Sequence, residues 1–136
     1  MNHQNIIRIA AIAGGTGVAL GAFGAHGLQQ IAEQGNMTAE QLKTFETAVR
    51  YQMYHALALF CLPAINGILN SKFTGYAASC FGSGILLFSG SLYLYSLSTW
   101  LFGSEIKWFG AITPLGGLLF IAGWICVFIS AMKRSK

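Results

Sequence analysis

The stretch that decides the fold is IAAIAGGTGVALGAFGAHGLQQIA, residues 9–32, which contains no Asp, Glu, Lys or Arg. Three further stretches, residues 51–71, 73–104 and 108–132, also contain none of these charged residues. A helix needs about 20 mostly apolar residues to cross a bilayer, because the hydrocarbon core is roughly 30 Å thick and each residue rises about 1.5 Å. All four stretches reach that length, so the sequence predicts four transmembrane helices.

The composition of the whole chain favours the same fold class. Only 9% of the 136 residues are charged, 54% are hydrophobic, and the mean hydropathy is +0.58. Soluble domains carry about a quarter charged residues, and a soluble bundle would need a polar outer face on each helix, whereas these helices are apolar nearly all round. We therefore predict an all-α integral membrane protein, a compact bundle with transmembrane helices at about residues 6–26, 51–70, 74–99 and 109–131.

This bundle is expected to form a single membrane domain over residues 1–136. For the first stretch, a cleaved signal peptide stays open as an alternative, with Arg8 as its basic region and Ala22 and Gly24 as the small residues before the cut.

The distribution of basic residues predicts the orientation. An even number of crossings puts both termini on one side, together with five basic residues and no acidic ones: Arg8, Lys72, Lys133, Arg134 and Lys136. The other side holds three basic residues and all four glutamates. Because Lys and Arg are retained in the cytoplasm during insertion, we expect a multi-pass protein of the plasma membrane (the inner membrane in bacteria) with both termini cytoplasmic.

Residues 38–50, in the first outer loop, have the pattern of an amphipathic helix. Thr38-Ala-Glu-Gln41 is a capping box, in which the Thr38 and Gln41 side chains satisfy the first backbone N–H groups. Leu42, Phe45 and Val49 then recur at helical spacing. The segment either lies on the outer membrane surface or runs straight into the second transmembrane helix.

Small residues follow helical spacing in three of the four stretches. In membranes, glycine faces allow the close backbone approach through which helices associate. The glycines expected at helix-packing faces are Gly14, Gly17, Gly21, Gly24, Gly82, Gly90, Gly116 and Gly123. Pro63 and Pro114 are expected to kink their helices or to mark a first turn, because proline lacks the backbone donor.

Four motifs occur in an order that is similar to a known family. They are GAFGAHGL (residues 21–28), FETAVRYQMYHALALF (45–60), LFSGSLYLYSL (87–97) and AITPLGGLLFIAGW (111–124). From about Ile9 to Trp124 the chain closely resembles the domain of unknown function 423 family, also called uncharacterised protein family 0382, which is related to the transmembrane-protein-256-like small membrane proteins. The resemblance implies a small inner-membrane protein with four helices, and it carries no catalytic assignment.

A candidate polar cluster at the outer interface comprises five residues: His26, Arg50, Tyr51, Gln52 and His55. Each histidine is expected to hydrogen-bond a loose backbone carbonyl or a neighbouring helix at the interface, with His26 near a helix end. A pH-responsive role stays open because histidine titrates near neutrality. Four of these residues are also expected to anchor their helix at the interface: Arg50, Tyr51, Gln52 and His55. The alternative is a pocket for a lipid headgroup or small anion between these four residues and the glycine face of the first helix.

A haem or metal site through His26 and His55 stays open too, although a third metal ligand (Glu33, Glu46 or Glu105) would have to be brought in by loop geometry. We predict no metal and no cofactor.

The absence of several catalytic and transport motifs limits the functions that the sequence favours. The sequence has no HExxH, GxSxG, P-loop or CxxC motif, and none of the four uncharged stretches contains the carboxylate that coupled transport usually needs. We predict a non-enzymatic structural, regulatory or partner-binding membrane component. Its partners would be the lipid bilayer and either a second copy or another membrane protein, with no nucleic acid. The alternatives are an oligomeric transporter or channel for a small solute, and a haem- or metal-binding membrane protein through His26 and His55.

Overall fold

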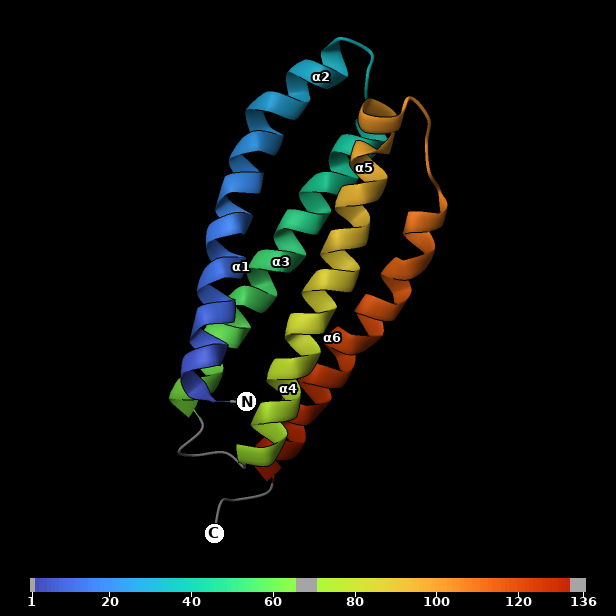
Figure 1. Ribbon diagram of the computed structural model, residues 1–136. Helices are drawn as coiled ribbons and strands as arrows, with labels where there is room; N and C mark the ends of the chain where they lie inside the picture. Colours follow the sequence, from blue (N-terminus) through green and yellow to red (C-terminus); the bar gives the residue numbers. More distant parts are fainter. Residues whose placement is uncertain (1, 66–70, 133–136) are drawn as a thin grey trace.

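Every element of the described chain is a helix. The computed structural model describes residues 2–65 and 71–132. The elements are α1 (His3–Phe23), η1 (Gly24–Leu28), α2 (Gln29–Glu33), α3 (Ala39–Ile65), α4 (Ser71–Gly84), η2 (Ile85–Ser89), α5 (Gly90–Phe102) and α6 (Trp108–Met132). The short segments η1 and η2 are single π-helical turns that continue the α-helices on either side of them. The long helices lie side by side, with the start of α1 and the end of α6 at the same end of the molecule (Figure 1).

Three continuous helical stretches are long and apolar enough to cross a membrane within the described residues. They are His3–Glu33, Lys72–Phe102 and Trp108–Met132. The first of them continues to Glu33, seven residues beyond the expected end at residue 26. The reason is packing, because the side chain of Leu28 is fully buried in a cluster with Met37 and Phe45. The expected end of the second transmembrane helix, residues 66–70, lies outside the described residues.

The predicted amphipathic segment is the first half of α3. The capping box at its start is confirmed: the backbone N–H of Gln41 donates to Thr38 Oγ1 and the backbone N–H of Thr38 donates to Gln41 Oε1, each at 3.1 Å. From there α3 continues without interruption to Ile65. Of the two arrangements left open by the sequence, the structure has the one in which this segment runs into the second long helix. Both prolines lie inside helices, Pro63 in α3 and Pro114 in α6.

Glycines set the distance between α1 and α3. A Cβ atom added to Gly17 would lie 2.6 Å from the Sδ atom of Met53, and one added to Gly24 would lie 3.2 Å from the ring of Phe45. Gly21 faces α3 between them. Lipid tails are as apolar as leucine side chains, so helices in a bilayer associate through close packing and not through hydrophobic burial. The missing side chains therefore allow the contact that holds α1 against α3.

A second set of close approaches joins α6 to α4 and η2. A Cβ atom on Gly116 would lie 2.7 Å from the backbone Cα of Phe88, and one on Gly123 would lie 2.5 Å from the ring of Phe81. The approach is reciprocal, because a Cβ atom on Gly84 would lie 2.5 Å from the ring of Phe120. Aromatic side chains of each helix thus fill spaces that glycines leave in the other.

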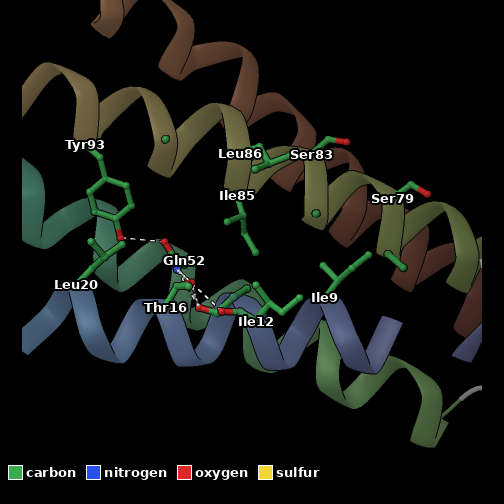
Figure 2. A pocket seen from close by; sticks show the side chains of 14 residues that line it. Ile9, Ile12, Thr16, Leu20, Gln52, Ser79, Ser83, Ile85, Leu86 and Tyr93 are labelled. Carbon is green, nitrogen blue, oxygen red and sulfur yellow. Dashed lines mark hydrogen bonds between the residues drawn. The ribbon is translucent and has the colours of Figure 1, made fainter. Parts of the chain in front are cut away.

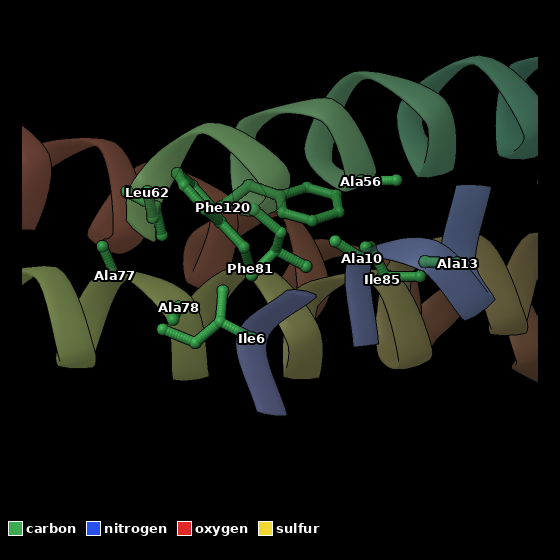
Figure 3. Close-up of a cluster of buried hydrophobic side chains, with 11 residues drawn as sticks. Ile6, Ala10, Ala13, Ala56, Leu62, Ala77, Ala78, Phe81, Ile85 and Phe120 are labelled. Atoms are coloured by element: carbon green, nitrogen blue, oxygen red, sulfur yellow. The ribbon is translucent and has the colours of Figure 1, made fainter. Parts of the chain in front are cut away.

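Two clusters of buried side chains lie between the helices. The larger one draws residues from α1, α3, α4, η2 and α6, including Ile6, Ala10, Leu59, Phe81, Ile85 and Phe120 (Figure 3). The smaller one, around Phe45, lies towards the opposite end of the molecule and fixes the loop between α2 and α3 through Met37. The described chain is therefore packed at both ends.

Gly116 and its neighbour Gly117 provide a matched test of this packing. Alanine at Gly116 would overlap the backbone of Phe88, whereas a Cβ atom at Gly117 would lie 3.8 Å from the Phe88 ring, an ordinary contact. We expect Gly116→Ala to lower the free energy of unfolding in detergent by about 1–3 kcal/mol. Gly117→Ala should leave it unchanged or raise it by up to about 1 kcal/mol through helix propensity. Equal effects of the two substitutions would contradict the packing described for α6.

Candidate functional site

The five residues of the predicted polar cluster do not form one group, and the contacts found among them join Tyr51 and His55, whose ring centroids are 6.3 Å apart. Arg50 is exposed, and its guanidinium donates to Thr47 Oγ1 of the same helix at 3.3 Å. Gln52 and His55 are buried, but they face different neighbours. The reason is rotational: successive residues are about 100° apart around a helix, so Arg50 and Gln52 point to nearly opposite sides.

His26 and His55 lie at different depths. Gly24, two residues before His26, faces Phe45, and His55 lies ten residues farther along α3, which is about 15 Å at 1.5 Å per residue. Two imidazole nitrogens that share a metal ion must each lie about 2 Å from it. In this arrangement the two histidines cannot ligate one metal ion or one haem iron. His26 is exposed within a continuing helix and does not mark a helix end.

No other cluster of the described residues replaces that site. Among residues 2–65 and 71–132, no group of three or more His, Cys, Asp or Glu side chains could hold a metal ion.

His55 occupies an aromatic pocket between α3, α4 and α6. Its Nδ1 atom is 2.8 Å from the backbone carbonyl of Tyr51, an acceptor, so Nδ1 carries the proton. Nε2 then accepts from the indole N–H of Trp124 at 3.3 Å. The imidazole ring stacks on Phe120 with centroids 3.5 Å apart. Both ring nitrogens are thus used within the protein, which makes His55 a contact between helices in this structure.

The buried amide of Gln52 joins three helices. Its Nε2 donates to the backbone carbonyl of Ala13 at 2.8 Å and to Thr16 Oγ1 at 2.9 Å, both on α1. Its Oε1 accepts from the hydroxyl of Tyr93, on α5, at 2.9 Å. The Gln52 side chain is 4% exposed, and its bond to the Ala13 carbonyl is buried, whereas the bonds to Thr16 and Tyr93 are part-buried. Gln52 is among the residues predicted from the sequence, whereas Thr16 and Tyr93 are not, although both are polar residues inside long uncharged stretches.

A lateral groove lies beside this network, between α1 and the α4–η2–α5 helix. Its volume is about 570 Å³. Figure 2 shows α1 along one wall, α4 to α5 along the other, and Gln52 of α3 on the floor. The α1 wall includes Ile9, Ile12, Thr16 and Leu20, and the opposite wall includes Ser79, Gly82, Ser83, Leu86, Gly90 and Tyr93.

Gly82 of α4 and Gly90 of α5 line this groove and do not pack against another helix. A Cβ atom added to Gly82 or Gly90 would meet nothing within 4 Å, and the same holds for Gly14. The other five glycines expected at helix-packing faces contact neighbouring side chains or backbone: Gly17, Gly21, Gly24, Gly116 and Gly123. Gly84, which the sequence analysis did not name, makes one of the closest approaches. The third helix therefore has one closely packed small-residue face and one open face.

The chain is similar in sequence to the members of one protein family. The family model described as "Protein of unknown function (DUF423)" matches residues 20–117. A UPF0382 membrane protein of Staphylococcus haemolyticus is 42% identical over 118 residues, covering 85% of each chain. YwdK of Bacillus subtilis, also a UPF0382 membrane protein, is 42% identical over 85% of this chain and 86% of its own. A UPF0382 membrane protein of Haemophilus influenzae is 39% identical over 96% of this chain and 95% of its own. No solved structure matches this chain.

The Gln52 network can be tested with a double-mutant cycle. Tyr93→Phe removes one hydrogen bond of the network and Gln52→Leu removes all three. Such bonds in membrane proteins contribute about 0.6 kcal/mol on average and up to about 1.7 kcal/mol each. We expect each substitution to lower the free energy of unfolding, and the double variant to lose at least about 0.5 kcal/mol less than the sum.

Tyr95→Phe is the control for this cycle, because the Tyr95 hydroxyl donates to Glu105 and not to Gln52. Its effect should add to that of Gln52→Leu. If the free-energy changes were additive in the Tyr93/Gln52 cycle as well as in the Tyr95/Gln52 control cycle, the network would be contradicted.

Proposed function

Because the chain belongs to the DUF423 family and its relatives are membrane proteins, we propose that it is a non-enzymatic membrane component that binds an apolar partner in its lateral groove. The observation that carries the proposal is the open face of the third helix. Gly82 and Gly90 line a groove of about 570 Å³ that no segment of the described chain fills. In a bilayer such a groove is occupied, because a void leaves its lining without contacts.

The polar groups beside the groove support a binding role without catalysis. The donors of the Gln52 amide and of the Tyr93 hydroxyl are used within the protein. Among the described residues, no buried side-chain nitrogen or oxygen lacks a hydrogen-bond partner. The buried polar groups at the groove are therefore used within the protein, and the groove offers its occupant mainly shape and apolar contact.

We further propose that α3 is a fourth transmembrane helix. It packs along α1, which is apolar enough to cross a membrane, from Phe45 near one end to Leu62 near the other. Its charged residues all precede Tyr51, and the stretch that follows carries no charge up to Lys72. Both termini would then lie on one side, and the five basic residues on that side favour the cytoplasm.

Photo-crosslinking in native membranes tests the groove. A benzoylphenylalanine at Leu86, which is 75% exposed on the groove wall, should give a defined crosslinked product. Adding Gly82→Leu, which fills the groove, should reduce that product severalfold. The matched position is Leu118 on α6, 61% exposed and outside the groove, whose products should not change with Gly82→Leu. Products at Leu86 that are insensitive to Gly82→Leu would refute the proposed function.

A further inference from the structure

The dimensions of the groove limit what can occupy it. On α1 it extends from Ile9 to Leu20 and on the opposite wall from Ala78 to Tyr93, which is about 17 and 22 Å at 1.5 Å per residue. A volume of about 570 Å³ spread over about 20 Å gives a mean cross-section of about 30 Å². An α-helix with its side chains is about 10 Å across and needs about 80 Å². A single extended hydrocarbon chain fits within the groove, whereas a transmembrane helix would have to pack across its open side.

The position of the groove along the helices points to one leaflet of the bilayer. The groove begins at Ile9, directly after Arg8, and the wall residue Ser79 lies two turns after Lys72. Arg8 and Lys72 are charged side chains that belong at the edge of the hydrocarbon core. From there a length of about 17–22 Å covers one leaflet, whose hydrocarbon is roughly 15 Å thick. The groove ends at the Gln52 network, where Tyr93 and Leu20 close it (Figure 2).

Basic side chains at the open end of the groove favour an anionic lipid headgroup. Arg8 lies four residues before Ile12 and Lys72 seven residues before Ser79, so both basic side chains share a helix face with groove-lining residues. Both are exposed. No acidic residue lies before Glu33 on the first helical stretch or between Lys72 and Phe102 on the third. A phosphate at this end would meet two positive charges and no carboxylate of these two helices.

We propose that the groove binds one acyl chain of an anionic glycerophospholipid, from the leaflet on the side of the termini, with the headgroup phosphate between Arg8 and Lys72. This inference rests on the proposed function and names its ligand. The chain supplies the van der Waals contact that Gly82 and Gly90 leave open, and the two basic residues supply the preference for an acidic headgroup. A lipid held in this way would cover the open face of α4 and α5 and fix α1 against them.

Native mass spectrometry of the purified full-length protein tests this inference. The probes are phosphatidylglycerol and phosphatidylcholine with identical acyl chains. A basic residue near an anionic headgroup contributes about fivefold to binding, so the wild type should bind phosphatidylglycerol at least about tenfold more tightly. The double variant Arg8→Gln with Lys72→Gln should bind both lipids alike. Gly82→Leu should lose binding of both, and Gly15→Leu, where a Cβ atom also meets open space but outside the groove, should bind like the wild type.

Each alternative result overturns the inference in a distinguishable way. Equal binding of the two lipids by the wild type would exclude headgroup selection, and lipid binding that survives Gly82→Leu in a folded protein would exclude the groove. Retention of glycerol phosphate without acyl chains would exclude the chain as the recognised part. If the Leu86 crosslink instead contains a protein and depends on an unfilled groove, the lipid assignment fails while the proposed binding function stands.

Discussion

The close approach of helix backbones at glycines is the constraint on which the rest of this structure depends. Apolar side chains gain little from meeting each other in lipid, so the helices are fixed where missing side chains let them approach. Gly17 and Gly24 fix α1 against α3, and Gly116 and Gly123 fix α6 against α4 and η2. These contacts involve different pairs of helices. Glycines therefore hold α1 against α3 but not against α4 and α5, and the lateral groove follows from that difference.

The Gln52 network complements the glycine contacts, because through α3 it links α1 to α5, which no glycine contact holds together. Its hydrogen bonds connect α3 to α1 through Ala13 and Thr16, and to α5 through Tyr93, across the floor of the groove. Buried polar groups are costly to leave unpaired in an apolar surrounding. The network thus fixes the position of α1 relative to α5 while it leaves the groove above it open. The glycine contacts and the Gln52 network together give the protein an apolar lateral groove that is closed at its deep end.

The sequence predicted the helical class, the Thr38 capping box and the membrane location because these depend on local composition and spacing. It did not predict which faces meet. Gly82 and Gly116 have the same residue type and similar surroundings in the sequence, yet one lines the groove and the other contacts the Phe88 backbone. Pairing His26 with His55 required the register of two helices, which is set by contacts such as Gly24 against Phe45 and Gly17 against Met53. Rotation and register are set by contacts between helices, which a single sequence does not record.

The most direct test of this account is contact between lipid and glycine Hα protons, measured by NMR in nanodiscs made with protonated lipid. The account predicts cross-peaks from acyl-chain methylenes to Gly82 and Gly90, which line the groove, and none to Gly17 or Gly116, which are packed against α3 and η2. The opposite result would be that Gly82 and Gly90 are as well shielded from acyl chains as Gly17 and Gly116 are. That result would contradict the proposed groove, because the groove would then be closed by protein.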